Sequence, residues 1–166
     1  ERWISMGAFG TGSLFIDFMA GVGLRYRCVN LRDTFFLENH QGIIDSVYRC
    51  FKHTARQAAQ RWGEKNLPER VQKALENPQR QNEFFDFLHV VAPRTDYDSG
   101  RADARGKPWA SYYLSVPDKM QLAPEGGFTS FPYSIARYVT APEEVYGRSP
   151  AMTALADIKM LNEMSK

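Results

Sequence analysis

The sequence is poor in the residues that build disulfide scaffolds and metal centres: among 166 residues there are two cysteines and three histidines. Cys28 and Cys50 have neither the number nor the spacing of a disulfide framework or a metal site. We expect two free, largely buried thiols, because a bridge would require their strands to pair. His40, His53 and His89 lie far apart in the sequence, which does not indicate a zinc site. His89 sits within an apolar strand and is expected to be a hydrogen-bonded core residue.

Long apolar runs and an excess of one charge are also missing. No apolar run approaches the length needed to cross a bilayer, so we expect neither a membrane span nor a signal peptide. Lys and Arg number 21 against 19 Asp and Glu, a net charge of +2, so the totals predict no broad basic face for nucleic acid. A hydrophobic content of 43%, with 11 Phe and 8 Tyr, is instead typical of a folded domain.

No catalytic or nucleotide-binding motif is complete. The glycines within 7–12 are not followed by the Gly-Lys-Ser/Thr of a phosphate loop, so we interpret them as turn glycines. Asp96 and Asp98 have the spacing of calcium ligands, but Lys107 stands where the closing Glu is needed, which favours a solvated loop. Ser149 lacks the second glycine of a nucleophile elbow and suits a helix cap better. The sequence therefore predicts no enzyme activity, no cofactor and no metal.

What the sequence does contain is a series of short strand and helix signals, which predicts an α+β fold of antiparallel or mixed β-sheet hairpins. Leu24, Tyr26 and Cys28 alternate with Arg25 and Arg27, which is the period of a half-buried strand. The predicted strands are 14–16, 24–28, 31–37, 43–52, 84–91 and 110–116, a hairpin partner at Met120 and Leu122, and 131–140.

Two stretches in the second half of the chain differ sharply in polarity. Residues 84–91 are apolar except at two positions, so we expect this strand to be covered on both faces. Residues 93–108 are polar and interrupted by glycines, which predicts an exposed, mobile loop. Glu125, Gly126 and Gly127 are interpreted as a turn.

Helices are indicated by their start and stop signals. Thr54 and Gln57 form a capping box that begins a helix, and Gly63 closes it. A second short helix is predicted within 66–77, and residues 2–6 are compatible with the last turns of another. The two short amphipathic helices are expected to lie on the sheet, because helices of this length are not stable alone.

The clearest start signal lies near the end of the chain. Gly147 permits a turn, Ser149 is a good N-cap, and Pro150 fits the first position of a helix. We expect one α+β domain over residues 1–148, with residues 149–166 as the start of a long helix that belongs to the same domain. Because the chain begins without Met and ends inside a helical pattern, we expect it to be a piece of a larger protein.

Several motifs follow one another along most of the chain: Gly10-Thr-Gly12, Leu24-Arg-Tyr-Arg27, Asn39-His-Gln-Gly42, Thr54-Ala-Arg-Gln57, Phe131-Pro-Tyr133, Glu144-x-Tyr-Gly-Arg-Ser-Pro-Ala-Met152 and Ile158-Lys-x-Leu-Asn162. Their order and spacing together resemble the head-to-tail connector, or portal, proteins of short-tailed bacteriophages. The chain would then cover the peripheral α+β region that the family calls the wing, over residues 1–148, and the first turns of a stem helix.

The resemblance implies a structural virion protein. Portal subunits form a ring, typically of twelve copies, at one capsid vertex, and DNA is packaged and ejected through the ring without sequence-specific contacts. Terminase, a tail adaptor and the capsid proteins are the implied partners. The implied location is the virion, with the host cytoplasm during assembly. A near-neutral chain suits such a channel, because a strongly basic wall would hold the phosphates.

Under this hypothesis the last helix packs beside its copies around an axis. We expect one apolar stripe and a second, methionine-rich face to contact neighbouring subunits, with an inter-subunit ion pair just before the helix. The stripe is Leu155, Ile158 and Leu161, the second face is Met152, Met160 and Met164, and the ion-pair residue is Arg148.

The alternative hypothesis is a nucleic-acid-binding module or a small enzyme of unknown substrate. Its best support is the interleaving of Tyr26 with Arg25 and Arg27, residues that could stack bases or contact phosphates. We favour the simpler interpretation, in which the aromatic and basic residues occupy opposite faces of one strand.

Overall fold

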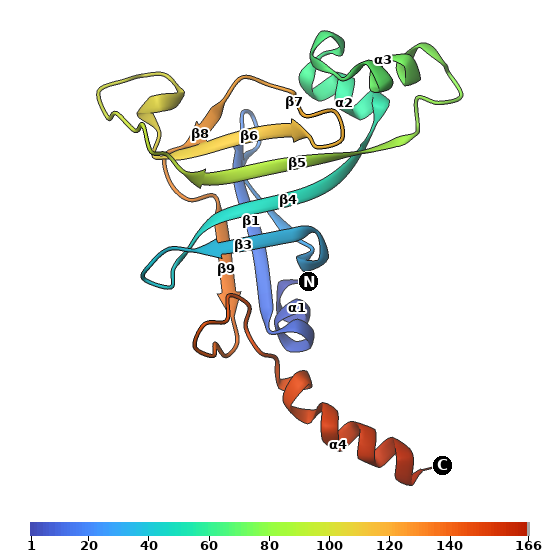
Figure 1. Ribbon diagram of the computed structural model, residues 1–166, viewed down its shortest axis with the longest axis vertical. Coiled ribbons are helices and arrows are strands. Elements are labelled where there is room, and N and C mark those ends of the chain that lie inside the picture. The colour runs from blue at the N-terminus through green and yellow to red at the C-terminus, as the bar shows by residue number, and fades with distance from the viewer. Residues whose placement is uncertain (166) are drawn as a thin grey trace. The chain divides into compact units, whose positions relative to one another are not determined.

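A computed structural model describes residues 1–165 (Figure 1). The fold is α+β, with 29% helix and 37% strand, as predicted. The described chain divides into two compact units, which are considered separately below. The domain boundary expected after residue 148 stays a prediction. Unit 1 comprises Glu1–Arg32, Leu37–Ile44 and Phe131–Lys166, and unit 2 comprises Asp33–Phe36 and Asp45–Ser130.

Unit 1 contains, within the described residues, a three-stranded antiparallel sheet in the order β2-β1-β9. Its middle strand pairs Phe15 with Arg27 on one side and with Tyr133 on the other. Helix α1 precedes the sheet and ends at Gly10, whose φ of 76° is a left-handed conformation that suits glycine. The elements are α1 (Arg2–Phe9), β1 (Thr11–Met19), β2 (Gly23–Val29), β9 (Tyr133–Arg137) and α4 (Pro150–Met164).

The second sheet makes up most of unit 2. In the described chain it has six strands, in the order β3-β4-β5-β6-β7, with β8 also paired to β6. The β4–β5, β5–β6, β6–β7 and β6–β8 pairs are all antiparallel. The strands are β3 (Thr34–Glu38), β4 (Ile44–Thr54), β5 (Phe84–Pro93), β6 (Trp109–Ser115), β7 (Met120–Gln121) and β8 (Gly126–Phe128).

Two short helices cover one end of this sheet and form the main core. Figure 1 shows α2 (Ala55–Trp62) and α3 (Glu69–Glu76) side by side at the end of β4 and β5. The predicted capping box is confirmed: Thr54 Oγ1 accepts from Gln57 N at 3.2 Å, and Gln57 Oε1 accepts from Thr54 N at 3.0 Å. The buried core residues here are Ala55, Ala58, Trp62, Leu67, Val71, Ala74, Phe85, Phe87 and Leu122.

Strand β2 has an unexpected distribution of burial. The strand exists and alternates as expected, but Leu24 and Tyr26 are exposed, whereas Arg25 and Arg27 are half-buried. The Arg25 guanidinium pairs with Asp17 on β1 at 2.9 Å, and the Arg27 guanidinium lies 5.6 Å from the centre of the Phe15 ring. Alternation therefore identified the two faces correctly, but the covered face is the one that carries the arginines.

Two other predictions need correction. Strand β5 is covered on both faces only near its end, since Phe84 and Asp86 are exposed. Residues 126–128 form strand β8 on β6 and not a turn. The polar loop is exposed, as predicted, and contains a 3-10 turn at Ala104–Gly106 and ion pairs from Arg94 and Arg105 to Asp96; its mobility stays a prediction.

Candidate functional site

The candidate site is the start of helix α4 together with the surface of that helix. Ser149 caps the helix as predicted, since its Oγ accepts from Met152 N at 3.0 Å. The same Oγ donates to the carbonyl of Ala8 in α1 at 2.9 Å, and Ser149 is only 1% exposed. One buried hydroxyl thus both begins α4 and ties it to α1.

Gly10 and Gly147, from opposite ends of the chain, contact each other next to this cap. A Cβ at Gly147 would lie 2.3 Å from Gly10 O, and a Cβ at Gly10 would lie 2.1 Å from Gly147 O. The approach also lets Gly147 N donate to the hydroxyl of Thr11, which is fully buried, at 2.8 Å. From the sequence, Gly147 was interpreted as a turn residue chosen for its backbone freedom. The structure gives a different reason for glycine here: there is no room for a side chain.

Arg137 and the backbone fasten the loop that leads into α4. The Arg137 guanidinium pairs with Glu38 and donates to the carbonyls of Gly42 at 3.1 Å and Val145 at 3.2 Å. Arg148 N donates to the carbonyl of Val139 at 2.7 Å. Because the bonds come from several separate segments of unit 1, the start of α4 is tied to that unit at several points.

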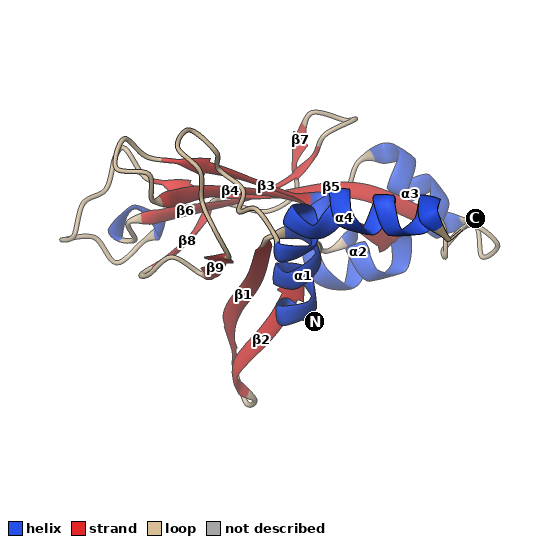
Figure 2. Cartoon of the chain, turned by 90° about the horizontal axis from the view of Figure 1, so that it is seen from below, coloured by secondary structure: helices blue, strands red, loops and turns tan. Residues whose placement is uncertain are grey.

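Beyond its first turn, α4 has little cover from the described chain: Ala154 is half-buried, and the described residues of the helix after it are exposed. Figures 1 and 2 show the helix running away from α1, and no residue of Pro150–Met164 is buried. The six predicted contact residues are all exposed, at 46% to 76%, and at 3.6 residues per turn they point in directions around the whole helix. They are Met152, Leu155, Ile158, Met160, Leu161 and Met164. Asp157, Lys159 and Glu163 lie between them, so the helix is not apolar throughout, but large exposed apolar residues in this number are typical of a surface that binds a partner.

Arg148 has a partner within its own chain. Its guanidinium makes two bonds to the Glu144 carboxylate, at 2.9 Å and 2.6 Å, on the exposed surface. This pairing holds the pKa of the Glu144 carboxyl below its ordinary value. The inter-subunit ion pair expected at Arg148 stays a prediction, and such a pair would have to compete with Glu144.

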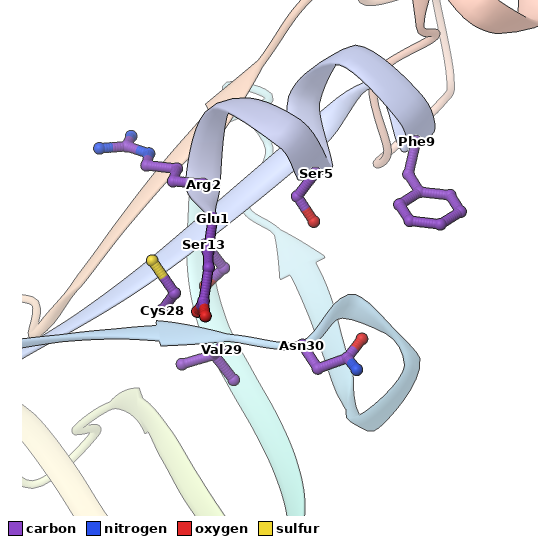
Figure 3. A pocket seen from close by; sticks show the side chains of 8 residues that line it. All are labelled: Glu1, Arg2, Ser5, Phe9, Ser13, Cys28, Val29 and Asn30. Atoms are coloured by element: carbon purple, nitrogen blue, oxygen red, sulfur yellow. The ribbon is translucent and has the colours of Figure 1, made fainter.

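A pocket of about 380 Å³ lies between α1 and the end of β2 (Figure 3). Ser13 Oγ is buried there and has no hydrogen-bond partner among the described residues. The pocket contains none of the residues that the sequence singled out for assembly. Its lining residues are Glu1, Arg2, Ser5, Phe9, Ser13, Cys28, Val29 and Asn30.

The remaining sequence candidates have structural roles. His89 is buried and lies 3.0 Å from Ser111 Oγ, with its ring stacked on Tyr113 at 4.3 Å, which confirms the predicted core histidine. Over residues 1–165 the structure shows no group of three or more His, Cys, Asp or Glu side chains that could hold a metal ion. No helix in this part of the chain is both long and apolar enough to span a bilayer.

Both cysteines are free, as expected, but they are less buried than predicted. Cys28 is half-buried and Cys50 is exposed. Desolvation, followed by the charges of Asp33 and Asp86, raises the pKa of the Cys50 thiol. A raised pKa disfavours the thiolate, so this thiol is not activated as a nucleophile.

Comparison with known proteins supplies an independent observation. A model of the family described as bacteriophage head to tail connecting protein matches residues 3–166. The chain is 30% identical over 166 residues to a protein named portal protein of Salmonella phage epsilon15, covering 99% of this chain and 30% of that protein. It is 29% identical over 159 residues to a protein named probable portal protein of Bordetella phage BPP-1, covering 94% of this chain and 28% of that protein. The chain thus spans less than a third of the length of these relatives.

Proposed function

Because this chain belongs to the family of bacteriophage head to tail connecting proteins, as its motifs predicted, we propose that it is part of a portal subunit that assembles into a ring. The ring would stand at one vertex of the virion capsid, between head and tail. DNA would pass through it during packaging and ejection. The protein's contribution is assembly and conduction, with no bond made or broken.

The exposed apolar surface of α4 is the observation that carries this proposal. Six large apolar residues occupy all sides of the helix, and none is covered by the described chain. Removing such residues from water is favourable by about 1.5–3 kcal/mol for each side chain that becomes fully buried. In a ring, one side of α4 meets the preceding copy and the other side meets the next copy, so large apolar residues on more than one side of the helix can all be covered.

The fixed start of α4 supports the same proposal. A ring closes only if every copy presents its helix at the same angle to its own body. The contact between Gly10 and Gly147, the bond from Ser149 to Ala8 and the bonds of Arg137 set that angle within unit 1. We infer that these residues orient the helix and that the apolar residues of α4 bind the neighbouring copies.

The other expected partners follow from the family alone. Terminase, a tail adaptor and the capsid proteins would bind the assembled ring in turn, first in the host cytoplasm and then in the virion. Double-stranded DNA would pass without sequence-specific contacts. The balanced composition, 21 basic against 19 acidic residues, is compatible with weak contact to the phosphates.

The test is electron microscopy of the protein in its full encoded length, together with its mass in solution. We expect rings with a central hole and a mass that is a multiple of the subunit mass. A variant with Leu155→Ser, Met160→Ser and Leu161→Ser should form fewer rings, whereas Phe84→Ser, at a similarly exposed position in unit 2, should assemble normally. A monodisperse monomer at high concentration would overturn the proposal.

A further inference from the structure

The loop between β5 and β6, residues 94–108, is closed at its base and folded on itself. Arg94 N donates to the carbonyl of Pro108 at 2.9 Å, so the two ends of the loop meet. Further along, Asp98 N donates to the carbonyl of Arg105 at 3.0 Å. Figure 1 shows this loop at the end of the six-stranded sheet that is opposite α2 and α3. A loop of this length that closes on itself is commonly a functional element.

Charged groups, and not apolar packing, link the residues within this loop. Every residue of 95–103 is exposed. Asp96 pairs with Arg105 at 3.1 Å, and Asp103 pairs with Arg101 at 2.6 Å and accepts from Arg105 N at 3.0 Å. Exposed ion pairs of this kind contribute little to stability, because water screens them. The contact that is shielded from water lies at the base of the loop.

Arg94 makes that shielded contact. Its side chain is 2% exposed, and its guanidinium bonds to both arms of the loop and to the segment that enters β8. Nε donates to the carbonyl of Lys107 at 3.1 Å, and Nη2 donates to the carbonyl of Gly126 at 3.2 Å. Nη1 pairs with the carboxylates of Asp96, at 3.4 Å, and Glu125. One buried cation thus joins three segments of the chain, and two carboxylates balance its charge.

The two carboxylates are the groups here that change charge between neutral and acidic pH. The Glu125 side chain is 33% exposed and that of Asp96 53%, so both can take up a proton from water. Tyr112 Oη donates to Glu125 Oε1 at 2.8 Å, and desolvation, followed by Glu125, raises the pKa of Tyr112, which stays a neutral donor. Arg94 keeps its proton throughout this range. The charged and titratable groups in and around the contact are Arg94, Asp96, Arg105, Lys107, Tyr112 and Glu125.

We propose that the contacts of Arg94 with Asp96 and Glu125 form an acid-sensitive latch, which holds the loop closed near neutral pH and releases it when the carboxylates take up protons. Protonation leaves the guanidinium buried without a counter-charge, which is strongly unfavourable. Opening the loop returns the guanidinium to water. The stabilisation of the closed loop is therefore present while the carboxylates are ionised and is lost as the pH falls. The latch rests on contacts within unit 2 and does not depend on the proposed ring.

The first test removes the charge of one carboxylate at constant pH. Glu125→Gln loses the negative charge but keeps an oxygen that accepts from Tyr112. In the full-length protein at pH 7, we expect residues 95–107 of this variant to lose about tenfold or more of their protection from amide hydrogen exchange, measured by mass spectrometry. Asp118→Asn removes a similarly shielded carboxylate, which pairs with Arg70 at 2.8 Å, and should leave the loop unchanged. Equal protection of the loop in Glu125→Gln and the unaltered protein would overturn the inference.

The second test lowers the pH of the unaltered full-length protein from 7 to about 4. The protection factor, which corrects for the direct effect of pH on exchange, should fall by about tenfold or more in 95–107 and stay unchanged in α2, at the other end of the sheet. The fall should be smaller in Glu125→Gln, because one carboxylate has already lost its charge. A loop that is unprotected at pH 7, or whose protection does not depend on pH, would contradict the latch. An equal fall in α2 would indicate unfolding of the whole unit and would also contradict it.

The third test changes the shape of the cation and keeps its charge. Arg94→Lys places a single ammonium where the guanidinium reaches four acceptors, so the loop should open more often. We expect trypsin to cut after Arg101 and Arg105 about tenfold faster or more at neutral pH, because cutting follows the population of the open loop. Arg70→Lys, with the same chemical change at an exposed pair, should be cut there at the unaltered rate. Unchanged cutting in Arg94→Lys would overturn the inference, and if that variant fails to fold, the Glu125→Gln and pH results decide.

Discussion

Helices α2 and α3 differ from α4 in what covers their apolar residues. The two short helices bury Ala58, Trp62, Val71 and Ala74 against strands of unit 2. The longer α4 buries no residue in the described chain, although six of its residues are large and apolar. Apolar residues at helical spacing therefore form a core in one part of this protein and an exposed surface, open to a partner, in another.

The difference lies in how each helix is attached. Helices α2 and α3 pack on the sheet, where the centres of the Phe87 and Trp62 rings are 5.0 Å apart. Among the described residues, helix α4 is held at its start, by Ser149 and the loop before it, and then extends away from α1. A helix that is stabilised at one end and carries exposed large apolar residues along its length is suited to contact another molecule.

The largest effect should come from the core under α2 and α3. Phe87→Ala should lower the free energy of unfolding by about 3–5 kcal/mol, because it leaves a cavity beside Trp62 and Phe51. Leu155→Ala in α4 should change it by less than about 0.5 kcal/mol in the unassembled protein. Urea denaturation measures both. A loss for Leu155→Ala comparable to that for Phe87→Ala would show that α4 is covered by its own chain.

The close contact below α4 should give the next largest effect. Gly10 and Gly21 both have positive φ, at 76° and 82°, but only Gly10 has atoms within 4 Å of an added Cβ. Gly21→Ala should cost about 1–2 kcal/mol for the left-handed backbone. Gly10→Ala should cost about 1–3 kcal/mol more, because the methyl group meets Gly147. Equal losses of stability for Gly10→Ala and Gly21→Ala in thermal unfolding would mean that the close contact between Gly10 and Gly147 is not required.

Removing the N-caps of α2 and α4 tests the same difference between a helix in the core and an exposed helix. Ser149→Ala and Thr54→Ala should each cost about 0.5–2 kcal/mol of helix stability. For Thr54→Ala the loss should appear in the unfolding of the whole of unit 2, because α2 is part of the core. For Ser149→Ala it should appear as faster amide hydrogen exchange confined to α4 and its contact with Ala8. Exchange that is equally fast throughout unit 1 would contradict this separation.

The smallest effect concerns the exposed pair of Glu144 and Arg148. The pKa of Glu144 is lowered by Arg148, so the pair's contribution is present above the unfolded-state pKa of the carboxyl and is lost as the pH falls through the folded-state pKa. Arg148→Ala should raise the Glu144 pKa towards its ordinary value. Carbon NMR titration of the Glu144 carboxyl measures this, and an unchanged pKa would mean that the pair does not form in solution.

Local signals in the sequence predicted the helix starts and the core histidine. Thr54 with Gln57, and Ser149 before Pro150, act through atoms three residues apart, so the sequence alone carries the information. His89 could be placed because the strand around it is apolar. The resemblance to the connector family rested on the order of such local motifs and was confirmed by the match over residues 3–166.

The contacts that hold α4 could not be predicted in the same way. Gly10 and Gly147, or Arg137 and Glu38, lie about a hundred or more residues apart, and no local pattern signals that they meet. Which face of β2 is covered could not be predicted for a related reason. Alternation shows which residues share a face, but which face is covered depends on distant elements such as Tyr133.

The most direct test of the account compares the oxidation of the α4 methionines by hydrogen peroxide in assembled and unassembled fractions of the full-length protein. Met152, Met160 and Met164 are 51%, 58% and 76% exposed, and half-buried Met120 in unit 2 serves as the internal reference. If neighbouring copies cover α4, the three methionines should oxidise quickly in the unassembled fraction and slowly in the assembled one, while Met120 stays the same in both. Equal oxidation of the three methionines in the two fractions would contradict the account.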